Sequence, residues 1–229
     1  MANRLLPFRQ YDENDVINLF ANDASDASPT TNSNGSAGVF VSIKSGGGNF
    51  SKDPITYVDR TELSASYGHT KVTAAAAGAT AGEVIGITLK QTLEADENGE
   101  KLLYNPVKKD ELQAVLSGQA CPVATRGVFT LTSDAFDTAA DGTNSCVPGY
   151  AAVISPENAG KVSGVAHSSL FGSLLTSTTG FAIVIEGGST VKYSTAHPIG
   201  TWIGTGTRTS TGPSTDVAAG FYSVLKLNL

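Results

Sequence analysis

The stretch PVATRGVFTLTS, residues 122–133, places β-branched and aromatic residues between a proline and a serine. Residues of these types fit the pleated, half-buried surface of a strand, and the flanking residues are typical of strand ends. We predict a strand here and in six further segments of the same form: GYAAVIS (149–155), KVSGVAHSS (161–169), GFAIVIEGG (180–188), STVKYSTA (189–196), GTWIGTGTRTS (200–210) and GFYSVLKLNL (220–229).

The half of the chain before this stretch shows the same pattern of strand-forming runs between turn residues. Strands are expected in GVFVSIKS (38–45) and ITYVDRTEL (55–63), and a β-hairpin in GEVIGITLKQTLEADENGEKLLYNP (82–106). The dipeptide Asn98-Gly99 tolerates the positive φ angles that a type I′ hairpin turn needs. So many closely spaced strands predict an all-β fold, a barrel or sandwich of short antiparallel strands.

One internal helix is expected, in KKDELQAVLSG (108–118). Leu112, Val115 and Leu116 would share one face of it, and Gly118 is placed to cap its carboxyl end.

The N-terminus reads as a separate unit. Residues 1–21 are rich in apolar side chains, whereas the seventeen residues 22–38 contain no aromatic or branched aliphatic residue. Asp12 or Asn14 can cap a short helix over 15–20, which must dock on something because one or two turns do not persist alone. Fully extended, residues 22–38 would span about 55 to 60 Å.

These features predict a docking arm (1–21), a flexible strap (22–38) and a β-rich body (39–229), which we expect to be a single domain. The arm would fill a groove on an adjacent subunit; the alternative is that it folds back on its own body as an edge strand and short helix. The residues expected to bind the partner are Leu5, Leu6, Phe8, Tyr11, Val16, Leu19 and Phe20.

Charge and composition exclude several classes of protein. The net charge of −6 over 229 residues argues against nucleic-acid binding, which requires clustered Lys and Arg. No apolar run is long enough to cross a membrane, and the N-terminus does not resemble a signal peptide. Residues 110–229 carry only eight acidic and five basic residues, which suits surfaces that other subunits cover. Cys121 and Cys146 are expected to be buried thiols, although a bridge between them is an alternative.

No residue pattern points to catalysis, a metal or a cofactor. His69, His167 and His197 each lack a second ligand-type residue two or four positions away. The glycine-rich GTGTRTSTG (204–212) lacks the lysine of a phosphate-binding loop and is predicted to be a hairpin loop. Four aromatic residues could line a sugar-binding face, although core packing is the default expectation for them: Tyr193, Trp202, Phe221 and Tyr222.

Three blocks of sequence carry a resemblance to a known group of proteins: MANRLLPFRQYDENDVINLFA (1–21), VLSGQACPVATRGVFTL (115–131) and GTWIGTGTRTSTGPSTDVAAGFYSVLKLNL (200–229). They resemble virion structural proteins of tailed bacteriophages, especially of the marine cyanophage type, and most of all head decoration (cement) proteins. The resemblance implies a non-enzymatic protein on the outer capsid surface, present in the host cytoplasm during assembly.

The resemblance further implies that the partner is the major capsid protein and that the chain forms a homo-oligomer, with a trimer favoured. No nucleic acid, membrane, metal or cofactor is expected. Two alternatives stay open: a tail, neck or fibre component, and a carbohydrate-binding module on the virion.

Overall fold

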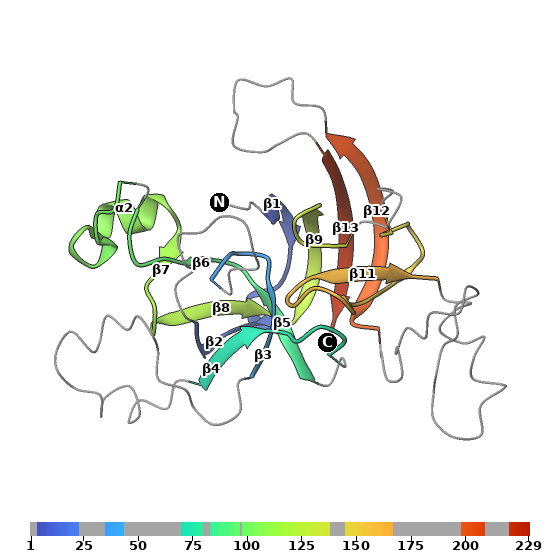
Figure 1. Ribbon diagram of the computed structural model, residues 1–229, viewed down its shortest axis with the longest axis horizontal. Coiled ribbons are helices and arrows are strands. Elements are labelled where there is room, and N and C mark those ends of the chain that lie inside the picture. The colour runs from blue at the N-terminus through green and yellow to red at the C-terminus, as the bar shows by residue number, and fades with distance from the viewer. Residues whose placement is uncertain are drawn as a thin grey trace.

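The computed structural model describes residues 4–22, 35–43, 70–79, 83–96, 98–137, 145–166, 198–208 and 220–229. The fold of these residues is all-β, as predicted, and consists of a six-stranded sheet beside a five-stranded closed barrel (Figure 1). A small lobe with one short α-helix extends from the barrel (Figure 1). The strands predicted at 55–63, 180–188 and 189–196 lie outside the described residues.

The sheet is antiparallel throughout, and its centre is the long pair formed by the C-terminal segments. The predicted hairpin loop at 204–212 is wrong in part, because Gly204 to Arg208 continue a strand and pair with residues 220–224. In order across the sheet, its strands are β1 (Leu5–Gln10), β9 (Arg126–Thr132), β13 (Gly220–Asn228), β12 (Gly200–Arg208), β10 (Ala151–Ile154) and β11 (Val162–Val165).

In order around the ring, the strands of the barrel are β2 (Val16–Ala21), β4 (Thr70–Ala74), β3 (Phe40–Ile43), β5 (Val84–Thr88) and β8 (Ala120–Ala124). All neighbouring pairs are antiparallel except β2 and β4, which are parallel. Val41, Val72 and Val123 come from three of these strands and form a cluster of their own. Because Phe40 and Val41 point to opposite faces of β3, we assign the valine cluster to the barrel interior.

Two chain segments cross between barrel and sheet, and they meet at Thr125. The stretch 122–133, expected as one strand, is divided here into β8 and β9. The other crossover is β1, the 3-10 turn η1 (Glu13–Asp15) and β2. The amide and hydroxyl groups of Thr125 donate to the carbonyl of Asp15 at 2.8 and 3.1 Å, and Leu229 N–H donates to the carbonyl of Thr125 at 3.2 Å. One residue therefore joins both crossovers to the C-terminus.

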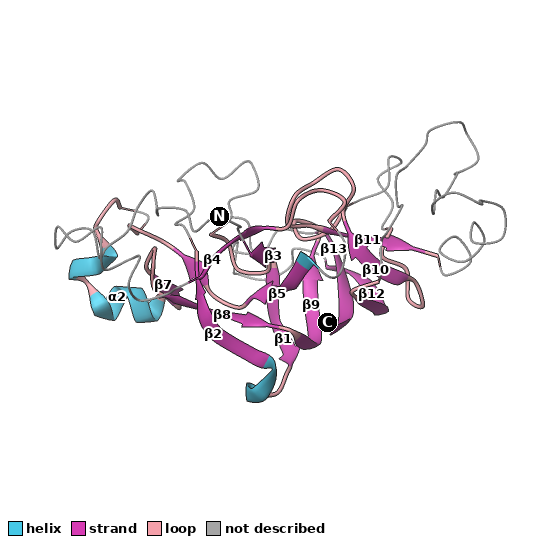
Figure 2. Ribbon diagram, turned by 90° about the horizontal axis from the view of Figure 1, so that it is seen from below, coloured by secondary structure: helices cyan, strands magenta, loops and turns pink. Residues whose placement is uncertain are grey.

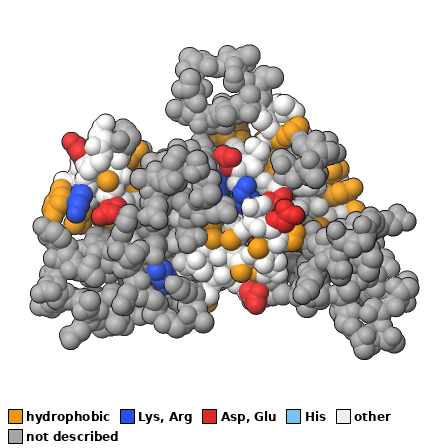
Figure 3. All heavy atoms as spheres, in the orientation of Figure 1, with side chains coloured by type: hydrophobic (Ala, Val, Ile, Leu, Met, Phe, Trp, Pro, Cys, Tyr) orange, Lys and Arg blue, Asp and Glu red, His pale blue; other side chains and the backbone are white. Residues whose placement is uncertain are grey.

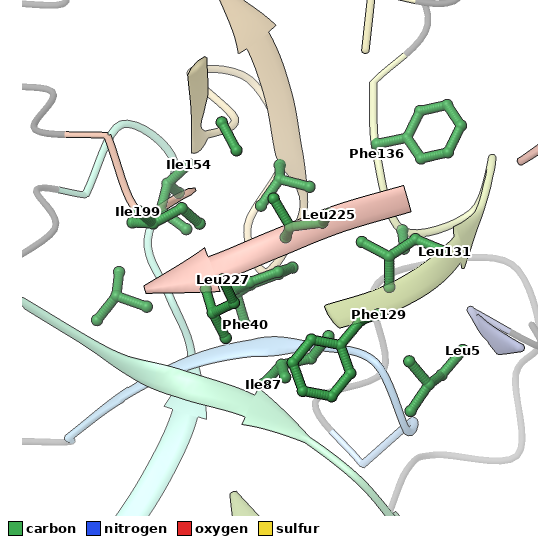
Figure 4. Packing of buried hydrophobic residues seen from close by; sticks show 14 of the residues in the cluster. Leu5, Phe40, Ile87, Phe129, Leu131, Phe136, Ile154, Ile199, Leu225 and Leu227 are labelled. Atoms are coloured by element: carbon green, nitrogen blue, oxygen red, sulfur yellow. The ribbon is translucent and has the colours of Figure 1, made fainter. Parts of the chain in front are cut away.

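Barrel and sheet share one hydrophobic core. Phe40 and Ile87 from the barrel pack with Phe129 and Leu227 from the sheet, and all four are buried (Figure 4). Leu5 of β1 lies in the same cluster, beside Leu131.

The N-terminal segment is part of this body where the structure describes it. In place of a separate arm, β1 pairs with β9, and β2 closes the barrel between β8 and β4. The prediction of a helix over 15–20 is wrong, because barrel strands on both sides offer β2 hydrogen-bond partners that a two-turn helix would lack. Asp12 does act as a cap: its Oδ1 accepts the Asn14 amide at 2.8 Å. Of the predicted strap, only residue 22 and residues 35–38 are described.

The lobe corrects two further predictions. The helix α2 spans Pro106–Glu111, with Asn105 accepting the Lys108 amide at its start, so it begins and ends earlier than expected. Val115 belongs instead to the two-residue strand β7 (Ala114–Val115), which pairs in parallel with β6 (Gln91–Thr92). The helix ends because Leu93, Leu102, Ala114 and Leu116 form a small core, which requires an extended chain after Gln113 at φ +50°.

The chain turns at Asn98-Gly99, with Gly99 at φ +82°, but the predicted two-residue type I′ turn is wrong. The Gly99 amide donates to the carbonyl of Asp96 at 3.1 Å and the Asp96 amide to the carbonyl of Glu100 at 3.0 Å, so the loop between Asp96 and Glu100 is longer than two residues. The hairpin around it is reduced to one bridge between Ala95 and Lys101. Beyond that bridge the chain turns into the 3-10 helix η4 (Leu102–Tyr104).

The approach of β5 to β8 yields a stability prediction. A methyl group on Gly86 would overlap the carbonyl oxygen of Ala124, so Gly86→Ala is expected to lower the free energy of unfolding by about 1–3 kcal/mol. Urea unfolding followed by the fluorescence of the single tryptophan measures it. Gly204→Ala is the control, because its methyl would meet Val224 Cγ2 at 3.4 Å, an ordinary contact. An equal loss in both variants would contradict the close approach of the strands.

Candidate docking surface

The edge strand β1 contains a bulge that exposes Phe8. Leu5 is opposite Leu131 and Arg9 is opposite Phe129, so the three residues 6–8 face the single residue Thr130. Such a bulge bends a strand and changes the direction of its side chains, and Pro7 is tolerated here because β1 is at the edge of the sheet. As a result Leu5 enters the core, whereas Phe8 is 79% exposed.

The structure therefore places the seven residues predicted to bind a partner in different environments. Leu5 and Leu6 are buried, so the structure does not leave them available to a partner. Val16 is partly buried against the shared core. The backbones of Leu19 and Phe20 lie in β2, and their side chains are outside the described part. Phe8 and Tyr11 remain accessible, and we call this pair the docking surface.

Tyr11 is held rigidly although it is 39% exposed. Its ring stacks on buried Phe129 with a centroid distance of 5.9 Å and an interplanar angle of 18°. A Cβ atom on Gly127 would lie 2.7 Å from the carbonyl oxygen of Gln10 and 2.8 Å from Tyr11 Cβ, so only glycine allows this close approach. Rigid aromatic side chains lose little conformational entropy on binding, which makes them effective contact residues.

The docking surface is bordered by an acidic turn. Asp12, Glu13 and Asn14 follow it and are all exposed. Arg9 does not neutralise this border directly, because its Nη1 donates to the carbonyl of Leu89 at 3.5 Å on the barrel. The turn, drawn in cyan between β1 and β2, projects from the lower edge of the molecule in Figure 2. A complementary partner surface would combine apolar and basic groups.

A second exposed apolar group lies at the tip of the lobe. Leu103, Tyr104 and Val107 are exposed within one 3-10 turn and the first turn of α2. Hydrophobic side chains are visible over the end of the molecule that carries α2 (Figure 3). Sequence reasoning missed this lobe tip because it assigned 102–106 to a hairpin strand; the Asn105-Pro106 pair, typical of a helix start, was the available signal.

The sugar-binding interpretation of Trp202 is wrong. Trp202 is fully buried, packs edge-on against Phe136 at 6.0 Å, and donates from Nε1 to the carbonyl of Ser163 at 3.5 Å. Phe221 packs partly against the same core, and the ring of Tyr222 covers Gly206. Tyr193 is outside the described residues.

Within the described ranges, no group of three or more His, Cys, Asp or Glu side chains could hold a metal ion. No helix in the same ranges is long and apolar enough to cross a membrane. The three histidines fall outside these ranges. The absence of enzymatic activity stays a prediction.

Both cysteines are free and buried, as expected. Burial raises the pKa of the Cys121 thiol to about 11 and that of the Cys146 thiol to about 12. Neither is therefore a candidate nucleophile at neutral pH, because the thiolate is the reactive form.

Comparison with known proteins adds no identity: the chain matches no family model, no curated protein and no solved structure.

The thiols give a prediction that tests the core. At pH 8 only about one Cys121 in a thousand is a thiolate, so native protein should not react with Ellman's reagent, and unfolded protein should release two equivalents. Rapid reaction of the native protein at pH 8 would contradict the burial of both residues.

The same thiols predict how stability depends on pH. Unfolded thiols ionise near pH 9 and folded ones near 11 to 12, so the unfolded chain loses protons first, and the free energy of unfolding should fall as the pH rises through this window.

Proposed function

We propose that this chain is a non-enzymatic capsid decoration protein that binds the outer surface of a phage head and stabilises the lattice of the major capsid protein. The observation that carries the proposal is the docking surface: a solvent-exposed Phe8 beside a Tyr11 that is fixed by the core. The resemblance of the three sequence blocks to virion proteins supports the same conclusion, as does the low charge of the C-terminal half.

The small binding free energy expected from each contact favours a partner that presents many equivalent sites. Burying Phe8 would contribute about 1.5–3 kcal/mol, which alone gives only weak binding. The lobe tip offers a second apolar contact on the same chain, and two linked contacts bind far more tightly than either one alone when a partner engages both. A capsid lattice supplies partner sites at fixed spacing, so modest contacts of this kind are sufficient there.

The docking surface replaces the arm as the element to test. Deleting residues 1–38 would remove β1 and β2, and with them the closure of the barrel, so its effect on binding would report on folding. A single exposed side chain avoids this difficulty.

The test is co-sedimentation with heads of the phage that encodes this chain, prepared without the protein. Wild-type chain should pellet in at least one copy per capsid-protein site, and Phe8→Ala should bind about 10 to 100 times more weakly, the equivalent of the lost burial. Ile203→Ala is the matched control, because Ile203 is also an exposed apolar residue but lies on β12. Its binding should equal that of wild type.

Failure of the wild-type chain to pellet with heads would overturn the decoration role. Binding to purified tails in place of heads would favour the alternative, a tail, neck or fibre component.

A further inference from the structure

We propose that Asn98 is a site of spontaneous deamidation, and that the carboxylate of Asp96 sets the rate of the reaction by holding the turn around Asn98 closed. The Asn98-Gly99 dipeptide lies in an exposed turn of the lobe, where it does not form the hairpin turn that its sequence suggested. Deamidation there needs no partner, so it does not depend on the proposed capsid role.

The reaction requires an asparagine, the next main-chain amide and water, and asparagine is one of the thermolabile residues. The nitrogen of Gly99 forms a bond to Cγ of Asn98 and loses its proton, and the side-chain nitrogen of Asn98 leaves as ammonia. Water then breaks one of the two C–N bonds of the resulting five-membered imide. Cleavage at Cγ leaves aspartate at position 98, and cleavage at the main-chain carbonyl leaves isoaspartate. No oxidant or reductant takes part.

The turn gives the nitrogen of Gly99 the access that this attack requires. Asn98, Gly99 and Glu100 are all exposed. Gly99 has φ +82°, and a Cβ atom built on it would meet no heavy atom within 4 Å. A side chain on the residue after asparagine hinders the approach of the nitrogen to Cγ, and glycine has none. The second Asn-Gly dipeptide of the chain differs, because its glycine, Gly35, is buried.

Asp96 opposes the reaction by holding the turn in place. The Gly99 amide donates to the main-chain carbonyl of Asp96 at 3.1 Å, and this bond must break before the nitrogen can attack Cγ. The amides of Asn98 and Glu100 both donate to Oδ1 of Asp96, at 2.9 and 2.8 Å. Because these two amides lie on either side of Gly99, one carboxylate oxygen holds the reacting nitrogen from both directions.

The carboxylate of Asp96 is itself anchored to α2. Its Oδ2 atom is 3.4 Å from Nζ of Lys108, and the Asp96 side chain is fully buried. Hydrogen bonds to a charged acceptor are among the stronger ones in proteins, so the native turn opens only rarely. Deamidation of the folded chain should therefore be slow and should follow the local opening of this turn.

The isoaspartate product cannot restore the closed turn. It adds one methylene group to the main chain before the nitrogen of Gly99, so the amides at positions 98 and 100 no longer fit around one oxygen atom. The turn is then no longer held to α2 through Asp96, and α2 carries exposed Val107 of the lobe tip. Deamidation would thus loosen the lobe tip as the protein ages.

Peptide mapping by mass spectrometry measures the conversion of Asn98 in protein kept at pH 8, and an isoaspartyl methyltransferase assay identifies the product. Native wild-type chain should convert about 10 to 100 times more slowly than chain unfolded in guanidinium chloride, and Asp96→Ala should convert about tenfold faster than native wild type, because hydrogen bonds to a charged acceptor are lost. Glu111→Ala is the matched control, since it removes a carboxylate from the last residue of α2, and its rate should equal that of wild type.

Ellman's reagent shows whether each variant is folded, because the native thiols are buried. If Asp96→Ala exposes them, Lys108→Gln replaces it: this variant keeps the bonds within the turn, loses the tie to α2, and should convert about two to five times faster than wild type. Wild-type Asn98 that stays intact over about a hundred half-lives of the unfolded chain overturns the site. A folded Asp96→Ala or Lys108→Gln chain that converts at the wild-type rate overturns the role of Asp96.

Discussion

The two hydrogen bonds that Thr125 donates to Asp15 tie together the two chain segments that cross between barrel and sheet. Both crossovers between barrel and sheet pass here, and the C-terminal residue bonds to the same threonine. Gly127, two residues later, lets the chain pass against Gln10 and Tyr11. Barrel and sheet also meet in the shared core of Phe40, Ile87, Phe129 and Leu227, so the junction and the core act together to fix how they pack.

This constraint explains why the N-terminus is so apolar. Leu5 completes the core of the sheet, and β2 completes the ring of the barrel, so most of the segment serves the body that holds it. The proposed binding surface uses Phe8, which the bulge in β1 leaves exposed, and the stacking of Tyr11 on Phe129 connects that surface to the core. Folding and the proposed docking thus use neighbouring residues of one short segment.

The local pattern was sufficient to predict the all-β class and to place strands within 149–155, 161–169 and 220–229, where the structure has β10, β11 and β13, since β-branched runs between turn residues need little tertiary context. The local pattern failed where contacts with residues distant in the sequence determine the secondary structure. Residues 16–21 became a strand because β4 and β8 flank them, and residues 114–116 left the helix to complete a small core. Alternation along β1 could not separate buried Leu6 from exposed Phe8, because the bulge between Leu5 and Arg9 breaks the period of two. Trp202 was predicted correctly only by the default of core packing.

The central claim is that the N-terminal strands are structural members of the body, and amide hydrogen exchange tests it most directly. The account predicts that the hydrogen-bonded amides of β2, Val16–Ala21, are protected to the same degree as those of β9, Arg126–Thr132, because closing the barrel and pairing the sheet are parts of one cooperative unit. Exchange of the β2 amides at the rate of an unstructured peptide, with β9 protected, would show that the segment is a free arm and would contradict the account.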